Sequence, residues 1–282
     1  MNARQQQIVR TLLEALPYIR RFNGATIVVA CEGAALHSER LRRWLAEDLA
    51  LLRLVGMKPA LVHEEMDTPV AEAMVSLVKW HGAPATSVVD PATAALARLV
   101  DEAVLDIPVA VPAVPLAVPD GLMAVPAAPM AVPAVPTAAP GTRVSGESPA
   151  AVGEAGQAQA TSVASVAGEI AATLTAEKLM FLADVEGIHD NDPVEQAVIS
   201  ECGLDELGRL QAVGAIDASM LPTVQAVRRA LEAGVASAHI IDGRIEHALL
   251  LEILTDAGCG TKVTLAGPSA VAAATVAGTN HG

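Results

Sequence analysis

An acidic turn follows a short apolar run in the C-terminal half of the chain. The run is LMFLA at residues 179–183, and the turn is DVEG at residues 184–187. An apolar run that ends at a glycine turn is typical of a strand buried on both faces. Open α/β sheets bind their ligands at the carboxyl ends of such strands. The sequence therefore predicts a ligand site here, with Asp184 and Gly187 as candidate residues.

Two more predicted strands end in turns that could contribute to the same ligand site. Residues 26–29 (TIVV) run into ACEGAA at 30–35, and residues 59–63 (PALVH) run into EEMD at 64–67. Between them, Ser38 is placed to cap a helix that Gly56 ends. Strand, helix and strand in this order predict a βαβ unit with a parallel strand pair and a right-handed crossover.

The other elements follow from hydrophobic periodicity and turn residues. We expect a helix over residues 4–22 that breaks or kinks at Pro17, because proline removes a backbone donor. Further helices are predicted at 74–80, 165–174, 204–213, 222–233 and 248–254, and further strands at 86–89, 239–241 and 261–265, the last at a sheet edge.

Proline divides the chain into parts. Half of its 18 prolines lie between residues 107 and 140, a density that forbids a helix or a central strand and favours polyproline II. We interpret residues 107–160 as an insertion and linker; it is either a spacer or a docking strip for a proline-recognising partner. The predicted parts are 1–22, a lobe at 23–106, the insertion, a second lobe at 161–266 and a flexible tail at 267–282.

Charge and composition exclude several classes of partner. The formal net charge is −14 and the pI is about 4.8, so neither nucleic acid nor an anionic membrane is expected as a partner. No apolar run reaches the roughly 18 residues of a membrane span, and no signal-peptide core follows the N-terminus. Aromatic residues make up only 2% of the chain, so aliphatic side chains must fill the core.

Metal-binding signals are weak. Three cysteines lie far apart without C-x-x-C spacing, which favours a reducing cytoplasm and predicts neither disulfides nor a zinc site. Asp190, Asn191 and Asp192 form an acidic run without EF-hand spacing, which we interpret as a solvated turn. The sequence therefore predicts no metal.

Four segments together resemble the acetylglutamate kinases of the amino-acid kinase family. They are LPYIRRFNGATIVV, DLALLRLVGMKPALVH, VAGEIAATLTAEKLMFLADVEGI and GRIEHALLLEILTDAGCGTKV, in the family's order. The resemblance covers most of the chain outside the insertion. It implies an α/β fold, a three-layer α/β/α sandwich around a mainly parallel sheet, with an acyl-amino-acid lobe followed by an ATP lobe. Such enzymes phosphorylate the side-chain carboxylate of N-acetylglutamate in arginine biosynthesis.

The chain departs from the family at its phosphate-binding turns. Where the family reads Lys-x-Gly-Gly-Asn, this chain has Ala30, then Glu32 and Gly33. Where the family reads His-Gly-Gly-Gly-Pro, it has His63 followed by Glu64 and Glu65. Cations and close backbone approach are what phosphoryl transfer requires, and acids replace them here.

Two further family positions differ in the second lobe. The family's Asn-Ala-Asp aligns with Ser162-Val163-Ala164, and the lysine after Met-x-Pro aligns with Thr223. With Ala30, Ala164 and Thr223 at catalytic positions, we expect a pseudokinase that needs no cofactor and acts as a regulatory or scaffolding subunit. The alternatives are an active kinase of N-acetylglutamate or a related acylated or carrier-bound amino acid, using ATP and Mg²⁺, and a binder without chemistry. Asp184 and Gly187 either bind nucleotide or close the strand end structurally.

The resemblance also implies a regulatory site. In arginine-regulated members an N-terminal helix links dimers into a hexamer, and arginine binds between this helix and the C-terminal segment. The residues that match are Tyr18, His247, Glu252, Gly258 and Gly260. Glu252 suits a guanidinium group; alternatively, His247 and Glu252 are surface residues of a core helix. The expected partners are arginine and a homo-oligomer, dimer or hexamer, or a hetero-oligomer with an active paralogue.

Overall fold

The computed structural model describes residues 2–32, 36, 38–64, 68–88, 93–109, 162–190, 197–256 and 258–268. Met1–Val111 and Thr161–Gly282 form one compact unit, so both predicted lobes belong to it. The predictions for the insertion beyond Val109, and for the tail beyond residue 268, lie outside the described residues.

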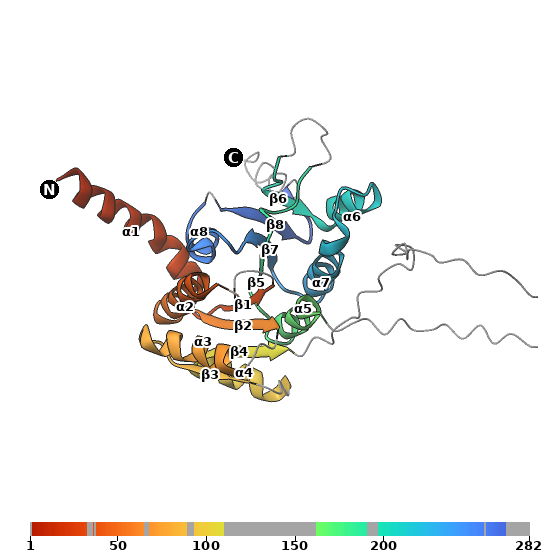
Figure 1. Cartoon of the computed structure of the whole chain (residues 1–282). Coiled ribbons are helices and arrows are strands. Elements are labelled where there is room, and N and C mark those ends of the chain that lie inside the picture. The colour runs from red at the N-terminus through yellow and green to blue at the C-terminus, as the bar shows by residue number, and fades with distance from the viewer. Residues whose placement is uncertain are drawn as a thin grey trace, which may run out of the picture. The chain divides into compact units, whose positions relative to one another are not determined.

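A mixed, mainly parallel sheet organises this unit (Figure 1). Its strands in the described part of the chain are β1 (Thr26–Cys31), β2 (Lys58–Glu64), β3 (Ala85–Ser87), β4 (Val104–Val109), β5 (Lys178–Ala183), β6 (Glu201–Gly203), β7 (Ser237–Asp242) and β8 (Gly260–Thr264). Their order is β3-β4-β2-β1-β5-β7-β8-β6. Among these described strands, only the β7–β8 pair is antiparallel. The run at 179–183 is thus a central strand, as predicted.

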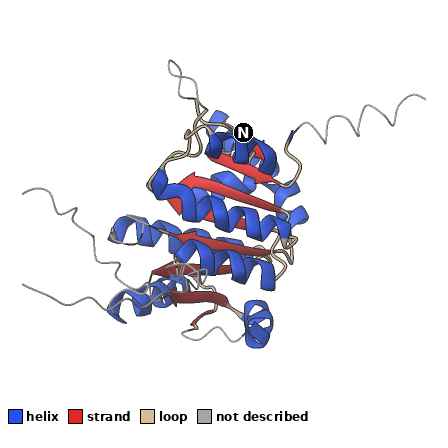
Figure 2. Cartoon of the chain, turned by 90° about the vertical axis from the view of Figure 1, so that its right-hand side faces the viewer, coloured by secondary structure: helices blue, strands red, loops and turns tan. Residues whose placement is uncertain are grey.

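Helices cover both faces of the sheet (Figure 2). One face carries α4 (Thr93–Glu102), α5 (Val163–Thr173), α6 (Leu204–Ala212) and α7 (Leu221–Glu232), the last preceded by a 3-10 turn, η2 (Ala218–Met220). The other face carries α1 (Ala3–Phe22), α2 (Glu39–Leu54), α3 (Thr68–Trp80) and α8 (Ala248–Leu254). The expected three-layer α/β/α sandwich is confirmed.

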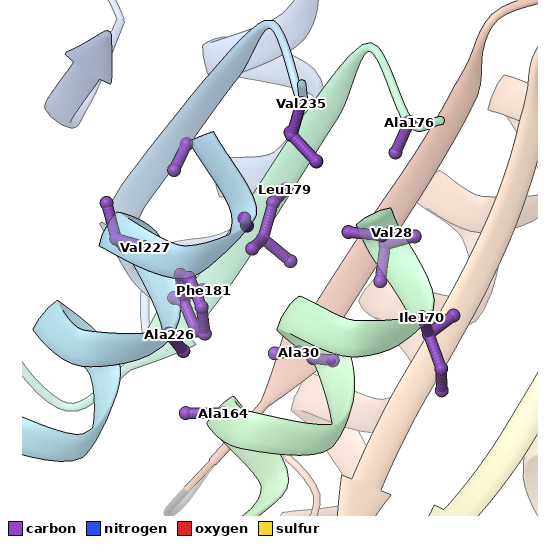
Figure 3. Close-up of a cluster of buried hydrophobic side chains, with 14 of the residues drawn as sticks. Val28, Ala30, Ala164, Ile170, Ala176, Leu179, Phe181, Ala226, Val227 and Val235 are labelled. Atoms are coloured by element: carbon purple, nitrogen blue, oxygen red, sulfur yellow. The ribbon is translucent and has the colours of Figure 1, made fainter. Parts of the chain in front are cut away.

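The period of two along each strand separates the two cores. In β1, Val28 and Ala30 join the cluster under α5 and α7, whereas Ile27 and Val29 join the cluster under α2. Figure 3 shows the first cluster, in which Phe181 of β5 lies against α7. Small residues allow this close packing, since a Cβ added to Gly168 of α5 would lie 3.3 Å from a carbonyl oxygen of α7. Alanine-rich helices thereby compensate for the scarcity of aromatic residues.

Sequence-based predictions were wrong about the sheet edge, about Pro17 and about the start of the insertion. The strand at 261–265 is not at the sheet edge, because the three-residue β6 pairs outside it. Such a short strand leaves almost no periodic signal. Of the two alternatives predicted at Pro17, a break or a kink, the break is wrong, since α1 continues through Pro17 to Phe22.

The predicted start of the insertion at residue 107 is wrong as well. β4 continues through Ile107, Pro108 and Val109, so these residues belong to the sheet. Proline is tolerated because the pairing of β4 with β3 ends at Asp106, and only β2 accompanies Pro108. Helix α4 and strand β4 were not predicted from the sequence.

The aromatic ring of Phe181 should dominate the stability of the core. It is 1% exposed and lies among aliphatic side chains of α5 and α7. We expect Phe181→Ala to lower the free energy of unfolding by about 3–5 kcal/mol through lost burial and a residual cavity. Chemical denaturation measures this. Trp80→Ala is the control, because that ring is 75% exposed and its loss should cost less than about 0.5 kcal/mol. Equal effects would contradict this core assignment.

Candidate functional site

The carboxyl ends of three neighbouring parallel strands meet at one sheet edge. Cys31 ends β1 and lies in register with His63 of β2 and Leu182 of β5. Glu32 and Asp184 directly follow β1 and β5, and Glu64 is the last residue of β2, so the predicted turns do converge. Gly33 and Glu65 lie outside the described residues.

Glu32 occupies the N-terminus of helix α5. Its Oε1 accepts a hydrogen bond of 3.0 Å from the backbone N–H of Ala164, and the Thr223 hydroxyl also hydrogen-bonds to this carboxylate. Burial raises the pKa of Glu32, and these two hydrogen bonds oppose that rise. Helix N-termini favour anions, including phosphate groups. The anion at this position is therefore a side chain of the protein itself.

Three other predicted site residues, Ala30, Ser162 and Gly187, contribute to packing or to helix capping. Ala30 is fully buried beside Ala164 in the cluster under α5 (Figure 3). Ser162 is the N-cap of α5, where its Oγ accepts from the N–H of Ser165 at 3.1 Å. Gly187 has a φ of 149°, and a Cβ there would lie 2.7 Å from Oγ1 of Thr261. Glycine is thus required at residue 187 by packing.

His63 is buried against β4. Its Nε2 lies 3.0 Å from Oδ1 of Asp106, and its Nδ1 lies 2.7 Å from the carbonyl oxygen of Glu64. Burial acts to lower the pKa of His63, but the hydrogen bond and charge of Asp106 outweigh it and raise that pKa. The imidazole therefore links β2 to β4 and is not directed at solvent.

A second site lies on the opposite face, beside the end of α1. A cavity of about 410 Å³ brings together four of the residues predicted for an effector: Tyr18, Glu252, Gly258 and Gly260. It is bordered by α1, α8 and the strands β5, β7 and β8. His247, the fifth predicted residue, is not among its lining residues.

Three residues that sequence reasoning missed form the polar centre of this cavity. Nδ1 of His239 lies 2.6 Å from Oε1 of Glu252, and its Nε2 lies 2.9 Å from Nζ of Lys178 and 3.0 Å from Oγ of Ser237. An ionised Glu252 can only accept, so Nδ1 carries the proton and Nε2 accepts from Lys178 and Ser237. Polar residues two apart in a buried strand were the available signal, because they share one face.

Burial controls the charges of this network. It lowers the pKa of Lys178 to about 8 and lowers that of His239. Burial acts to raise the pKa of Glu252, but the hydrogen bonds from His239 and from the N–H of Cys259 outweigh it and lower that pKa. The cavity thus presents a neutral imidazole, a carboxylate and a readily deprotonated ammonium group. Such a set of groups suits a small ligand with both cationic and anionic groups.

Two glycines of the cavity wall have no room for a side chain, Gly258 against the Glu252 carboxylate and Gly260 against the backbone of β7. Gly258 has a φ of 59°, and a Cβ there would lie 2.9 Å from Oε2 of Glu252. A Cβ at Gly260 would lie 2.1 Å from the carbonyl oxygen of Ile240. Tyr18 closes the α1 side, where its hydroxyl hydrogen-bonds to Asp256. Both glycines are therefore needed for this geometry.

The described residues contain no cluster of three or more His, Cys, Asp or Glu side chains placed to hold a metal ion. Asn191 and Asp192 of the acidic run lie outside them. No helix in the described ranges is both long and apolar enough to cross a membrane.

Comparisons with known proteins agree with this architecture. The model of the amino acid kinase family matches residues 139–242. Acetylglutamate kinase from Synechococcus elongatus is 34% identical over 92% of this chain and 93% of its own length, and that from Stutzerimonas stutzeri is 31% identical over 92% and 96%. Among solved structures, N-acetylglutamate synthase from Neisseria gonorrhoeae has a TM-score of 0.65 at 19% identity, covering 91% of this chain and 63% of that one. Carbamate kinase from Giardia lamblia has a TM-score of 0.54 at 15% identity, covering 86% and 99%. The chain belongs to the amino acid kinase family and is a homologue of the acetylglutamate kinases.

Proposed function

We propose that this acetylglutamate kinase homologue is a pseudokinase of arginine or amino-acid biosynthesis. In this proposal it acts in the cytoplasm as a regulatory or scaffolding subunit, in a homo-oligomer or with an active paralogue. Arginine is the proposed effector, bound in the cavity beside Glu252. No cofactor is required.

The position of Glu32 carries this proposal. Its carboxylate lies on the N-terminus of α5, where a phosphate group would otherwise be favoured. A phosphate oxygen brought within about 4 Å of this carboxylate would be repelled by roughly 4 kcal/mol at the effective dielectric of a protein surface. Glu64 adds a second negative charge nearby.

The residues at the proposed catalytic positions support the same conclusion. Ala30 and Ala164 are fully buried, and Thr223 is engaged with Glu32. None of the three side chains carries a charge. Stabilising charge on a transferring phosphoryl group is the main task of a kinase site, and the loss of one such cation costs about 10³-fold in rate.

The effector proposal rests on the second cavity. Glu252 offers a carboxylate to a guanidinium group, and Lys178 offers an ammonium group to a carboxylate. An amino acid with a cationic side chain satisfies both. The cavity lies on the opposite face of the sheet from the α5 N-terminus, so it does not depend on phosphoryl transfer.

Identity to kinases over nearly the whole chain favours a second candidate function. The chain would then phosphorylate the side-chain carboxylate of N-acetylglutamate, or of a related acylated or carrier-bound amino acid, with ATP and Mg²⁺. Glu32 would have to leave α5 in that case.

We expect no turnover when the purified protein receives ATP, Mg²⁺ and N-acetylglutamate in a coupled assay for ADP. The double variant Ala30→Lys and Thr223→Lys should also be inactive, because Glu32 remains on α5 and residue 30 lies in an apolar cluster. An acetylglutamate kinase assayed in parallel is the positive control. Turnover by the wild-type chain that Glu64→Ala abolishes would refute the pseudokinase proposal.

Calorimetric titration with arginine tests the effector. We expect binding by the wild-type protein and a loss of at least about tenfold in affinity for Glu252→Gln, which removes the charge facing the guanidinium group. Glu232→Gln is the matched control, because that residue is exposed at the end of α7 and is not among those lining the cavity. A wild-type titration without binding, alone and with a kinase-competent paralogue, would exclude arginine as the effector.

A further inference from the structure

His247 has an unusual backbone conformation directly before α8. Its φ is 56° and its ψ is 30°, in the left-handed region that is unfavourable for residues with a side chain. Its imidazole contacts helix α2, where Nδ1 lies 2.5 Å from Oδ1 of Asp48. An unfavourable backbone that is retained at a specific contact points to a role for that contact.

Asp48 connects α2 to α8 in a second way. Its side chain also accepts a hydrogen bond from the backbone N–H of Leu250, the third residue of α8. The N-cap residue His247 makes no side-chain cap of its own. Asp48, which is 2% exposed, therefore caps α8 from another helix. A helix of seven residues depends strongly on such contacts.

Helix α8 positions the Glu252 carboxylate. Glu252 lies in α8 and reaches both His239 and the N–H of Cys259 in the polar cavity. Any movement of α8 relative to β7 would separate these partners. We propose that the Asp48–His247 contact is a proton-sensitive brace that holds α8, and with it Glu252, at the wall of the cavity. The consequence for effector binding rests on the proposed function, whereas the brace between α2 and α8 does not.

The charges around the brace come from three elements. In the described part of the chain, Glu47 of α2 and Glu246 of the turn before α8 each lie 3.9 Å from Nε2 of His247. Glu47 also lies 3.6 Å from Nε2 of His81, which follows α3. Arg40 lies 4.3 Å above the ring of Trp44, whose centroid is 6.0 Å from that of His247. Of the three carboxylates named around this contact, Asp48 is buried, whereas Glu47 is only half-buried and Glu246 is exposed.

Burial raises the pKa of Asp48 from 3.8 to about 6, against the lowering effect of His247. Opening of α8 exposes Asp48 to water and returns its pKa toward the lower value. The docked state therefore binds the proton more tightly, so docking is strongest at low pH and weakens as the pH rises through about 6. Between pH 5 and pH 7 the opening constant of α8 should rise about tenfold.

Hydrogen exchange of the full chain measures this opening without any ligand. Protection factors, corrected for the pH dependence of chemical exchange, are compared for the amides of α8 and of α7 between pH 5 and pH 7. We expect protection in α8 to fall about tenfold and protection in α7 to stay constant. Constant protection in α8, or an equal fall in α7, would overturn the proposal.

Two variants identify the group responsible. Asp48→Asn is a neutral isostere that keeps an acceptor for Leu250, so its α8 protection should not vary with pH. Glu47→Gln removes the adjacent carboxylate on the same helix and should retain the tenfold fall. A pH dependence that survives in Asp48→Asn, or disappears in Glu47→Gln, would assign the effect to another group and overturn the proposal.

An arginine titration at pH 5.5 and pH 7.5 extends the test to the cavity. The ratio of the wild-type affinity to the affinity of Asp48→Asn should be higher at pH 5.5 than at pH 7.5. Lys178 and His239 are present in both proteins, so their titration does not change this ratio. If arginine does not bind at either pH, the proposed effector fails, and the exchange experiment alone decides on the brace.

Discussion

A single carboxylate at the N-terminus of α5 determines the chemistry of the sheet edge. Glu32 follows the central strand β1. The parallel register of β1 with β2 and β5 fixes the end of this strand and therefore the position of Glu32. The N–H of Ala164 and the hydroxyl of Thr223 satisfy the carboxylate, which offsets part of the cost of burying it. The α5 N-terminus, a favoured place for a phosphate, thus belongs to the protein's own structure.

The two faces of the sheet carry different kinds of side-chain layer. Side chains alternate along the central strands, so each strand contributes to a dry core under α5 and α7 and to a second layer under α2 and α8. The second layer admits a buried polar network at the ends of β5 and β7, from Lys178 through His239 to Glu252. Because these groups satisfy one another, the cavity beside them is compatible with a stable core. The proposed binding function therefore does not depend on the α5 side of the sheet.

Much of the architecture could be predicted from the sequence. The βαβ unit, the central strand at 179–183 and the helix–strand order of the second lobe follow from periodicity and glycine turns. Short or atypical elements were missed: β6 has three residues, and β4 contains Pro108, which the rule for central strands excludes. Pro108 is tolerated because β4 is paired on one side only at this residue. Such pairing depends on the tertiary structure and cannot be read from the sequence.

The candidate sites were predicted less completely. The family resemblance pointed to Tyr18, Glu252, Gly258 and Gly260, which the structure brings to one cavity, but it pointed to His247 instead of His239. Both histidines precede Glu252 closely in the sequence, so spacing alone does not show which of them lines the cavity. The structure distinguishes them, because His239 lies in strand β7 and His247 forms the left-handed turn before α8. The engagement of Glu32 with α5 could not be read from spacing, since the two segments are 132 positions apart.

Calorimetric titration with inorganic phosphate, of the wild-type protein and of Glu32→Gly, tests the proposed loss of phosphate binding most directly. Removing the carboxylate should free the N–H groups at the start of α5, so the variant should bind phosphate while the wild-type protein does not. Glu64→Gly, a change at the end of the neighbouring strand, should leave the wild-type result unchanged. Phosphate binding by the wild-type protein as tight as by Glu32→Gly would contradict the account.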